Sequence, residues 1–431
     1  MGDLRDRLRR AAQMAPPPSA EAAAPAAPAA KEPTEPGLPS VRARLRRREE
    51  RSAARPEASA AAEPHRLPPG FVSAPGPLGE TWVRELRAPL EDVEELLAVD
   101  VGTLALLARD DRLRRLDLRR AVFLDTETTS LSGGAGVLVF LVGLGRVDAQ
   151  AGEFCLRQHF MVSPTQERSM LAGVAADLAQ SDSVVTFFGK SFDRHRLEDK
   201  FTIHGLTSHF PTEIHADLYH VTRARFGWKL ADCRLRTAEE SLLGIRRVDD
   251  LPGSEAPKAY FDFLARRPTL LPRVVEHNER DVLSLPRLLA RLAKALPGSR
   301  AQECLAGMKA ALATKRWETA KGLAEAALGG APPVGRELEI DALRGLAEST
   351  KRLCGAEAAL PIWRRLAELG CVESALDVVR QLERTGAPRE ARADALARVR
   401  GLLASMQAGP QRDRWLSECE SAARKTGVSG A

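Results

Sequence analysis

The stretch FLDTETTS, residues 123–130, decides the fold. The apolar run 121–124 indicates a β-strand that ends at Asp125, after which polar residues take over at once. Because side chains alternate along a strand, Asp125 and Glu127 lie on the same face. Adjacent carboxylates offer the hard oxygen ligands that Mg²⁺ and Mn²⁺ prefer, although an acid after a strand is more often a turn or helix-capping residue. The stretch therefore predicts a pair of acids at the edge of a sheet.

The neighbouring segments predict a mixed sheet with helices packed against it. A second strand at 137–144 forms a β-hairpin with the first across the turn-rich residues 130–136. Further apolar patterns predict strands at 154–160, at 184–188 and ending at 217–219, and helices at 166–179, 192–203 and 271–292. Strands that come first and then alternate with helices are typical of an α/β domain.

A third acid follows the next buried strand. In VVTFFGKSFD, residues 184–193, a strand and a glycine-containing turn precede Asp193 at the opening of a helix. This arrangement brings Asp193 to the same edge of the sheet as Asp125 and Glu127. The alternative is a plain helix N-cap that the helix dipole favours.

The last acid lies on the long helix predicted at 271–292. In VVEHNERDVLSL, residues 274–285, His277 and Asp281 are four residues apart and lie on one helix face. The pattern predicts a histidine beside a metal-binding acid. Taken alone, the fragment fits a His–Asp pair on a surface helix better.

Taken in order, Asp125, Glu127, Asp193 and Asp281 resemble the metal-binding set of the DEDD family of 3′–5′ exonucleases, over about residues 120–292. A closer resemblance is to the YprB-like ribonuclease H-like domain family. The segments that carry it are LDTETTSLSGGAG, FFGKSFDRHRLEDKF, DCRLRTAEESLLGIRRVDDLPG and EHNERDVLSL. The resemblance implies a ribonuclease H-like mixed sheet flanked by helices.

The resemblance also implies roles for the acids and for their basic neighbours. Asp125, Glu127 and Asp281 would bind one Mg²⁺ or Mn²⁺, and Asp125 would bridge to a second ion with help from Asp193. His277 would accept or orient the proton of the attacking water. From their positions beside Asp193, Lys190 and Arg194 could contact phosphates, although such side chains at a helix start are more often simply solvated. Asp217, at the end of a predicted strand, could support the metal ligands from behind.

Two residues depart from the family patterns. Phe188 stands where many members have an asparagine, which puts substrate positioning or catalytic efficiency in doubt. His277 occupies the position of a tyrosine in one DEDD subclass, whereas the histidine subclass has one more residue before the final Asp. The general-base role of His277 therefore rests on proximity.

The rest of the chain divides into three further parts. Residues 1–66 are rich in Ala, Pro and Arg and are expected to be a disordered tail, and 67–119 to be a lead-in segment packed on the domain at 120–296. Residues 297–431 predict an all-α helical-repeat domain. The similar settings of Trp317 and Trp363 resemble tetratricopeptide-like repeats, with a plain helical bundle as the alternative.

Composition limits the class of protein. Of the 431 residues 44% are hydrophobic and 28% charged, and the sequence contains no apolar run long enough to cross a bilayer and no secretory signal, so we expect a cytoplasmic protein without membrane contact. Six scattered cysteines without a CxxC pair argue against a zinc ribbon. Residues 1–66 carry 13 basic and 9 acidic side chains, so they hold most of the net charge of +6.

These observations together predict a metal-dependent nuclease, specifically a 3′–5′ exonuclease that acts on the 3′ end of single-stranded DNA or RNA. The helical repeats would bind a protein partner. Two alternatives stay open: a nucleic-acid-binding or scaffold protein with a catalytically weak domain, and an endonuclease on the same fold.

Overall fold

A computed structural model of the chain describes residues 67–90, 93–130, 136–296, 300–330 and 334–426. The expected tail at 1–66 lies outside the described residues, and the four-part division of the chain stays a prediction.

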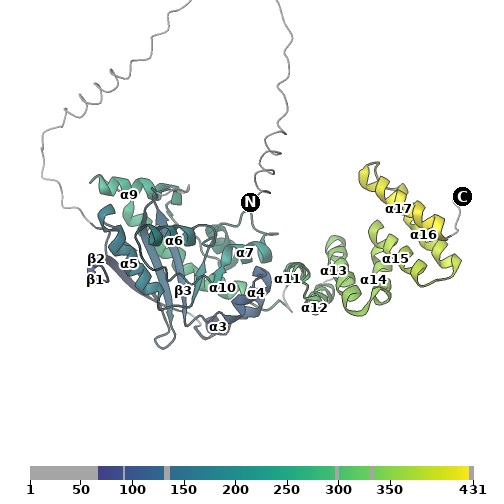
Figure 1. Ribbon diagram of the computed structural model, residues 1–431, viewed down its shortest axis with the longest axis horizontal. Helices are drawn as coiled ribbons and strands as arrows, with labels where there is room; N and C mark the ends of the chain where they lie inside the picture. Colours follow the sequence, from purple (N-terminus) through teal and green to yellow (C-terminus); the bar gives the residue numbers. More distant parts are fainter. Residues whose placement is uncertain (1–66, 91–92, 131–135, 297–299, 331–333, 427–431) are drawn as a thin grey trace, which may run out of the picture. The chain divides into compact units, whose positions relative to one another are not determined.

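One mixed sheet of seven strands forms the centre of the first domain (Figure 1). Its strands are β1 (Val72–Gly76), β2 (Gly79–Pro89), β3 (Ala121–Thr128), β4 (Val139–Asp148), β5 (Glu153–Phe160), β6 (Ser183–Thr186) and β7 (His215–Asp217). They lie in the order β1-β2-β5-β4-β3-β6-β7. Strands β3, β6 and β7 run parallel, and the other neighbours pair antiparallel. The predicted ribonuclease H-like mixed sheet is confirmed.

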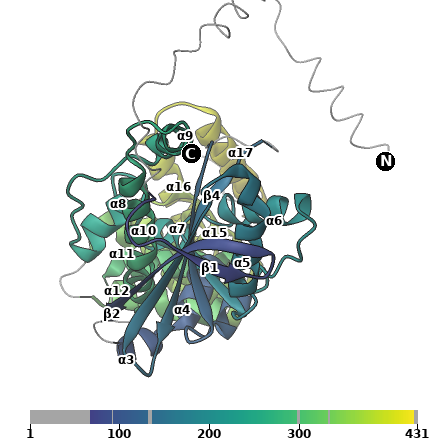
Figure 2. The same cartoon turned by 90° about the vertical axis from the view of Figure 1, so that its left-hand side faces the viewer.

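Helices cover both faces of this sheet (Figure 2). They are α3 (Val93–Leu97), α4 (Val101–Ala108), α5 (Glu167–Leu178), α6 (Asp193–Ile203), α7 (Leu218–Phe226), α8 (Leu235–Ala238), α9 (Ala256–Leu264) and α10 (Leu271–Leu292). Short 3₁₀ or π-helical turns lie at Asp111–Arg115, Pro164–Gln166, Glu239–Leu243 and Gly253–Glu255. Side chains that alternate along β3 point to opposite faces of the sheet. On one face, Val122 and Leu124 pack in a core with α5 and α6. On the other face, Phe123 packs in a core with α7 and the C-terminal half of α10.

Two glycines on β4 let α10 approach the sheet closely. A Cβ atom at Gly143 would come within 2.5 Å of Asn278 Oδ1 and 2.9 Å of Val282 Cγ2. A Cβ atom at Gly145 would come within 2.8 Å of Val282 Cγ1 on α10 and within 2.2 Å of the Phe154 ring on β5. Since Gly143 lies opposite Asp125 in the β3–β4 register, the close approach occurs beside the first predicted site residue.

The structure differs from the sequence-based expectations in several element boundaries. Strand β3 continues through both acids to Thr128 instead of ending at Asp125. The strand expected to end at 217–219 stops at Asp217, because the Asp217 carboxylate accepts a hydrogen bond from Tyr219 N at 3.1 Å and caps α7. The expected lead-in segment also contributes β1 and β2 to the sheet, where β2 pairs with β5.

The C-terminal part is all helical, as predicted. Its helices are α11 (Ala301–Ala313), α12 (Trp317–Leu328), α13 (Arg336–Cys354), α14 (Ala356–Glu368), α15 (Val372–Arg384), α16 (Arg389–Ala404) and α17 (Pro410–Thr426). Gly355, Gly370 and Gly386 adopt positive φ angles of 89°, 88° and 63° at the breaks between helices. Each helix packs on the next, but the specific tetratricopeptide-like assignment stays a prediction. Among the described helices, none has the length and apolar character needed to cross a membrane.

A buried ion pair joins α7 to the first helix of this array. The Arg225 side chain is fully buried, and its guanidinium contacts the Glu303 carboxylate at 2.7 Å. Arg225 also donates to the carbonyl oxygens of Leu292 at 2.8 Å and Lys294 at 2.5 Å, beyond the end of α10. The charge of Arg225 is therefore compensated by residues from α11 and from the end of α10.

Replacing Glu303 by alanine would leave the buried Arg225 guanidinium without its counter-charge. We expect Glu303→Ala to lower the free energy of unfolding by about 3–5 kcal/mol, the usual cost of breaking a buried pair. Urea denaturation followed by circular dichroism measures it. Glu325→Ala, at an exposed position on α12, is the control, with an effect within about 0.5 kcal/mol. An equally small effect of Glu303→Ala would contradict this account of the contact.

Candidate functional site

Strand β3 turns its two acids toward α10. Asp125 and Glu127 lie opposite Gly143 and Leu141 of β4, on the face that α10 covers. Asn278 of α10 donates from Nδ2 to Asp125 Oδ2 at 2.8 Å and to the Asp125 carbonyl at 3.2 Å. The helix therefore holds the Asp125 carboxylate in place directly.

A chain of polar side chains fixes Asn278 in turn. Gln158 of β5 donates from Nε2 to Asn278 Oδ1 at 2.8 Å and to the carbonyl of Val275 at 3.0 Å. Arg84 of β2 donates to Gln158 Oε1 at 2.8 Å and pairs with Glu279 at 2.6 Å. Gln158 and Asn278 are fully buried, so no water competes for these hydrogen bonds. They therefore fix the position of α10 relative to β5.

The fourth predicted acid, Asp281, is engaged by an arginine. Arg247 Nη2 lies 2.6 Å from Asp281 Oδ1, and the Arg247 guanidinium also binds both oxygens of Glu239 at 2.5 and 2.6 Å. Arg247 Nη1 donates to Asp250 Oδ2 at 3.2 Å. The contact between Arg247 and Asp281 lacks hydrogen-bond geometry, so Asp281 Oδ1 is a buried acceptor without a well-aligned donor.

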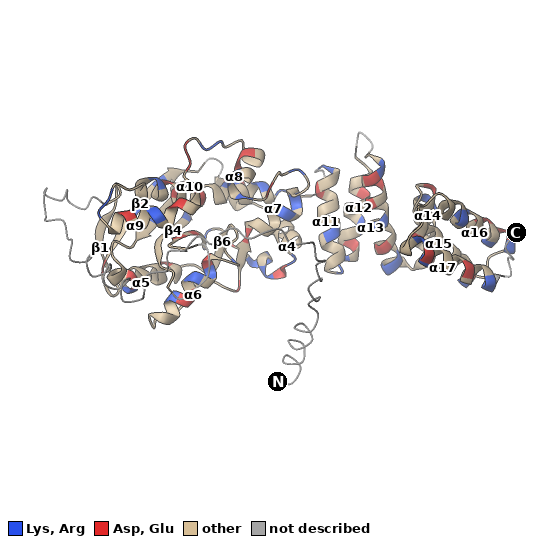
Figure 3. Ribbon diagram, turned by 90° about the horizontal axis from the view of Figure 1, so that it is seen from above, with Lys and Arg blue, Asp and Glu red and all other residues tan. Residues whose placement is uncertain are grey.

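His277 lies within this cluster of charges. Its Nδ1 is 2.9 Å from Asp250 Oδ1, and its Nε2 is 3.7 Å from Asp281 Oδ2. An ionised Asp250 can only accept, so the short contact favours the imidazole tautomer with the proton on Nδ1. Figure 3 shows acidic and basic residues side by side on α10.

Asp193 reaches the cluster from the other face of the sheet. It opens α6, and its Oδ1 accepts a hydrogen bond of 2.5 Å from Thr126 Oγ1. Thr126 lies between Asp125 and Glu127 on β3, so its side chain points away from theirs. The structure brings Asp193 to β3 beside Asp125 and Glu127, with its carboxylate turned to Thr126, and its role at a metal site stays a prediction.

The acids lie close enough to repel one another. Burial raises the pKa of Asp125 well above its usual range, and repulsion from Asp281, Asp193 and Glu127 adds to the shift. Burial, followed by repulsion from Asp281 and Asp193, does the same to the pKa of Glu127. Burial also raises the pKa of Asp281, and it raises the pKa of Asp193 to about 7. The site therefore gathers several carboxylates with too few hydrogen-bond donors and positive charges to offset the cost of burying them.

The donor set suits a hard divalent cation, but the site is not preassembled. Within the described residues, no group of three or more His, Cys, Asp or Glu side chains surrounds a common point as a finished metal site. The carboxylates bind Asn278, Thr126 and Arg247 instead. Carboxylate oxygens are nevertheless the ligands that Mg²⁺ and Mn²⁺ take, and Asp281 Oδ1 lacks a well-aligned donor.

The turn before Asp193 explains the roles of Asp217 and Phe188. The Asp217 carboxylate accepts hydrogen bonds from the backbone nitrogens of Phe188 at 2.8 Å and Lys190 at 3.0 Å. These bonds hold Phe188 at a φ of 67°, in the left-handed region, with 44% of the residue exposed and its ring 5.0 Å from Tyr219. Asparagine tolerates this conformation far better than phenylalanine, which gives a backbone reason for an asparagine at this position.

The two weaker nucleic-acid candidates are paired locally. Lys190 Nζ lies 3.4 Å from Asp110, and Arg194 Nε lies 3.1 Å from Glu198 on the same helix. A role in phosphate binding stays a prediction for both.

Sequence reasoning missed Arg247, Glu239, Asp250 and Asn278. Three of them lie in or beside a short π-helical turn at Glu239–Leu243, and no spacing in the sequence links this segment to Asp281. The segment 232–253 was singled out only for its family resemblance. Asn278 could have been noticed, because it lies three residues before Asp281, on the same side of α10.

Comparison with known proteins supports the ribonuclease H-like assignment. Residues 122–320 match the family model described as the RNase_H superfamily. A segment of 174 residues, 40% of this chain, is 38% identical to the uncharacterized protein YprB of Bacillus subtilis (strain 168). The match spans 41% of the relative's own length. Residues 122–320 are thus similar to the RNase_H superfamily, and part of the chain is similar to YprB.

Neutralising Asp193 should stabilise the metal-free protein at high pH. The unfolded carboxyl titrates near pH ~4, and the folded one at about 7, so its contribution to stability is full below pH ~4 and is lost as the pH rises to about 7. Asp193→Asn keeps an acceptor for Thr126 and removes the buried charge. We expect a higher melting temperature than wild type at pH ~8 in chelator, and a difference that vanishes toward pH ~4.

Asp199→Asn is the matched control, because Asp199 is exposed on the same helix. A pH-independent difference between Asp193→Asn and wild type would mean that the Asp193 carboxyl titrates normally.

Relief of the left-handed backbone at Phe188 gives a separate stability test. Phe188→Asn should raise the melting temperature by about 2–4 °C, which corresponds to roughly 1 kcal/mol for a domain of this size. Phe188→Ala removes the ring but keeps a strained Cβ, so it should give no such gain. Differential scanning calorimetry distinguishes the variants, and a lower melting temperature for Phe188→Asn would show that the ring contact with Tyr219 outweighs the strain.

Proposed function

We propose that the ribonuclease H-like domain is a metal-dependent nuclease that removes nucleotides from the 3′ end of single-stranded nucleic acid. The observation that supports it is the convergence of Asp125, Glu127, Asp193 and Asp281 on one end of β3, from three separate elements. Carboxylates that are withdrawn from water close to one another, as Asp125 and Glu127 are beside Asp281, destabilise a fold, so their presence is best explained by a bound cation.

Divalent ions, Mg²⁺ or Mn²⁺, would supply charge stabilisation for the entering and leaving oxygens of the phosphodiester when bound. Asp125 and Glu127 would hold them from β3, Asp281 from α10 and Asp193 from α6. Asn278 keeps the Asp125 carboxylate turned toward α10.

His277 is the proposed proton acceptor. With Nδ1–H donated to Asp250, the lone pair on Nε2 faces the Asp281 side of the site. A water molecule between the histidine and the acids would lose its proton to Nε2, and Asp250 would stabilise the imidazolium that forms. In this scheme Asp250 orients the His277 imidazole.

A second candidate function is nucleic-acid binding or scaffolding without turnover. One observation favours it: Arg247 already compensates Asp281, and the acids are not assembled around a common point in the described residues. If Arg247 stays on Asp281 when substrate binds, the site holds less metal and cleaves poorly.

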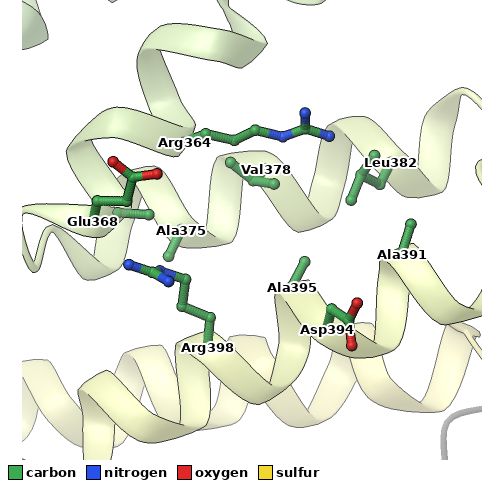
Figure 4. A pocket seen from close by; sticks show the side chains of 10 residues that line it. Arg364, Glu368, Ala375, Val378, Leu382, Ala391, Asp394, Ala395 and Arg398 are labelled. Carbon is green, nitrogen blue, oxygen red and sulfur yellow. The ribbon is translucent and has the colours of Figure 1, made fainter.

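We further propose that the helical array holds a protein partner. A cavity of about 380 Å³ lies between α14, α15 and α16, with an apolar floor that includes Val378 and Leu382 (Figure 4). The side chains of Arg364, Glu368, Asp394 and Arg398 line its rim and offer charges of both signs. The expected cytoplasmic location stays a prediction.

The direct test incubates the full chain with 5′-labelled single-stranded DNA and RNA in Mn²⁺, Mg²⁺ or chelator. We expect a metal-dependent ladder that shortens from the 3′ end. Asp125→Asn and Asp281→Asn should each lower the rate more than about 100-fold, because even residues that only support a metal ligand are typically worth about 10–100-fold. Asp199→Asn serves as the control on an exposed acid.

Other outcomes of this assay identify the alternatives. Internal cuts would support the endonuclease, and binding without cleavage would support the scaffold. Full metal-dependent activity in Asp125→Asn would remove the carboxylate cluster from the reaction.

A further inference from the structure

A groove runs along α10, next to the acid cluster. Two adjoining cavities of about 410 and 320 Å³ form it, and both are lined by Leu90 and Arg287. The walls come from the end of β2, the segment 242–248 and α10. We call this feature the α10 groove.

Positive charge dominates the walls of the α10 groove. Among the described residues, six basic side chains and one acid, Glu95, line the two cavities, and one of the six, Arg247, is buried against acids. The basic residues are Arg246, Arg247, Arg280, Arg287, Arg291 and Lys294. The apolar lining includes the half-buried side chains of Leu90, Leu243 and Leu283. Basic walls with an apolar lining suit a ligand that carries both regular negative charge and flat hydrophobic groups.

The basic residues of α10 form one stripe. Arg280, Arg287, Arg291 and Lys294 are spaced by seven, four and three residues, which places them along the same side of the helix and its C-terminal extension. At a rise of ~1.5 Å per residue, the stripe extends for about 21 Å. This length accommodates several successive nucleotides, whereas a small anion would occupy only one point.

Two of the basic side chains in the groove are held by exposed ion pairs that are weak enough to exchange. Arg246 pairs with Glu240 at 3.1 Å and Lys294 with Glu95 at 3.5 Å, and both pairs are exposed. Exposed pairs contribute about 0–1 kcal/mol, so a phosphate can replace the carboxylate at little cost. Arg287 presents an exposed side chain to both cavities.

One end of the groove meets the acid cluster. Arg280 directly precedes Asp281, and Arg247 lines the groove while it contacts Asp281 at 2.6 Å. A strand in the groove would therefore approach the carboxylates along α10.

We infer that the α10 groove binds the backbone of single-stranded nucleic acid and guides the strand to or from the acid cluster. Phosphates contact the basic stripe, and bases cover the apolar lining, so binding is independent of sequence and sensitive to salt. The part of the inference that has the strand led to or from the acid cluster rests on the proposed function. Binding of the strand in the groove does not require cleavage.

The test measures binding in the absence of turnover. Fluorescence anisotropy with labelled oligothymidylate and oligouridylate, in chelator and over a range of salt, gives the affinity and its salt dependence for the full chain. Arg280→Gln combined with Arg287→Gln should lower the affinity about tenfold or more and reduce the slope of log K against log salt by about 2, near 1 for each lost phosphate contact.

Arg115→Gln combined with Arg119→Gln is the matched control. These two arginines are exposed and lie before β3, outside the groove. The control should bind as wild type. Thermal unfolding checks that both double variants fold, and Arg287→Gln alone, at an exposed position, tests the groove with the least perturbation.

Unchanged affinity and salt slope in the folded groove variants would overturn the inference, as would a wild-type chain that binds no oligonucleotide. Competition by polyglutamate as strong as that by oligonucleotide would assign the groove to an acidic polypeptide instead. The cleavage assay tests the proposed function independently of the groove. If the chain cleaves nucleic acid but the groove variants bind as wild type, only the groove proposal is contradicted. If binding depends on the groove but no cleavage occurs, only the nuclease proposal is contradicted.

Discussion

The repulsion among buried carboxylates at one end of β3 is the constraint on which the rest of the site depends. Asp125, Glu127 and Asp281 are held together by packing that brings α10 onto β4, through the space left by Gly143. The fold partly relieves this charge in three ways: Asn278 donates to Asp125, Thr126 donates to Asp193, and Arg247 contacts Asp281. Such an arrangement lowers the stability of the fold, and proteins usually keep a destabilising arrangement of this kind because it is needed for function.

Helix α10 connects most of the proposed activity. One side of it carries His277, Asn278 and Asp281, which face the acids of β3 or the residues around them. The adjacent side carries the basic stripe of the α10 groove. Arg247 belongs to both sets, because it lines the groove and contacts Asp281. A phosphate in the groove would attract the Arg247 guanidinium, and a cation at Asp281 would displace it, so both events would draw Arg247 away from Asp281 and the two sites are linked physically.

Much of the fold was predictable because local patterns agree with the global structure. Helix α10 begins and ends at the predicted residues, and the hairpin of β3 and β4 follows from its apolar runs. The strands β1 and β2 were harder, since their pairing depends on the distant strand β5. The four acids were found from residue type and order. The Thr126 bond to Asp193 was not, because the sequence does not show on which face of the sheet the helix that begins at Asp193 packs. The role of Arg247 was not predicted, because its partners Glu239, Asp250 and Asp281 come together around it only in the folded chain.

The most direct test of the central claim is a crystal structure of the full chain grown with Mn²⁺, with anomalous diffraction to locate the ion. The account predicts anomalous density between Asp125, Glu127 and Asp281, with Arg247 turned away from Asp281 and the Asp193 carboxylate released from Thr126. Crystals that contain Mn²⁺ in solution but show no density there, with Arg247 still on Asp281, would contradict it.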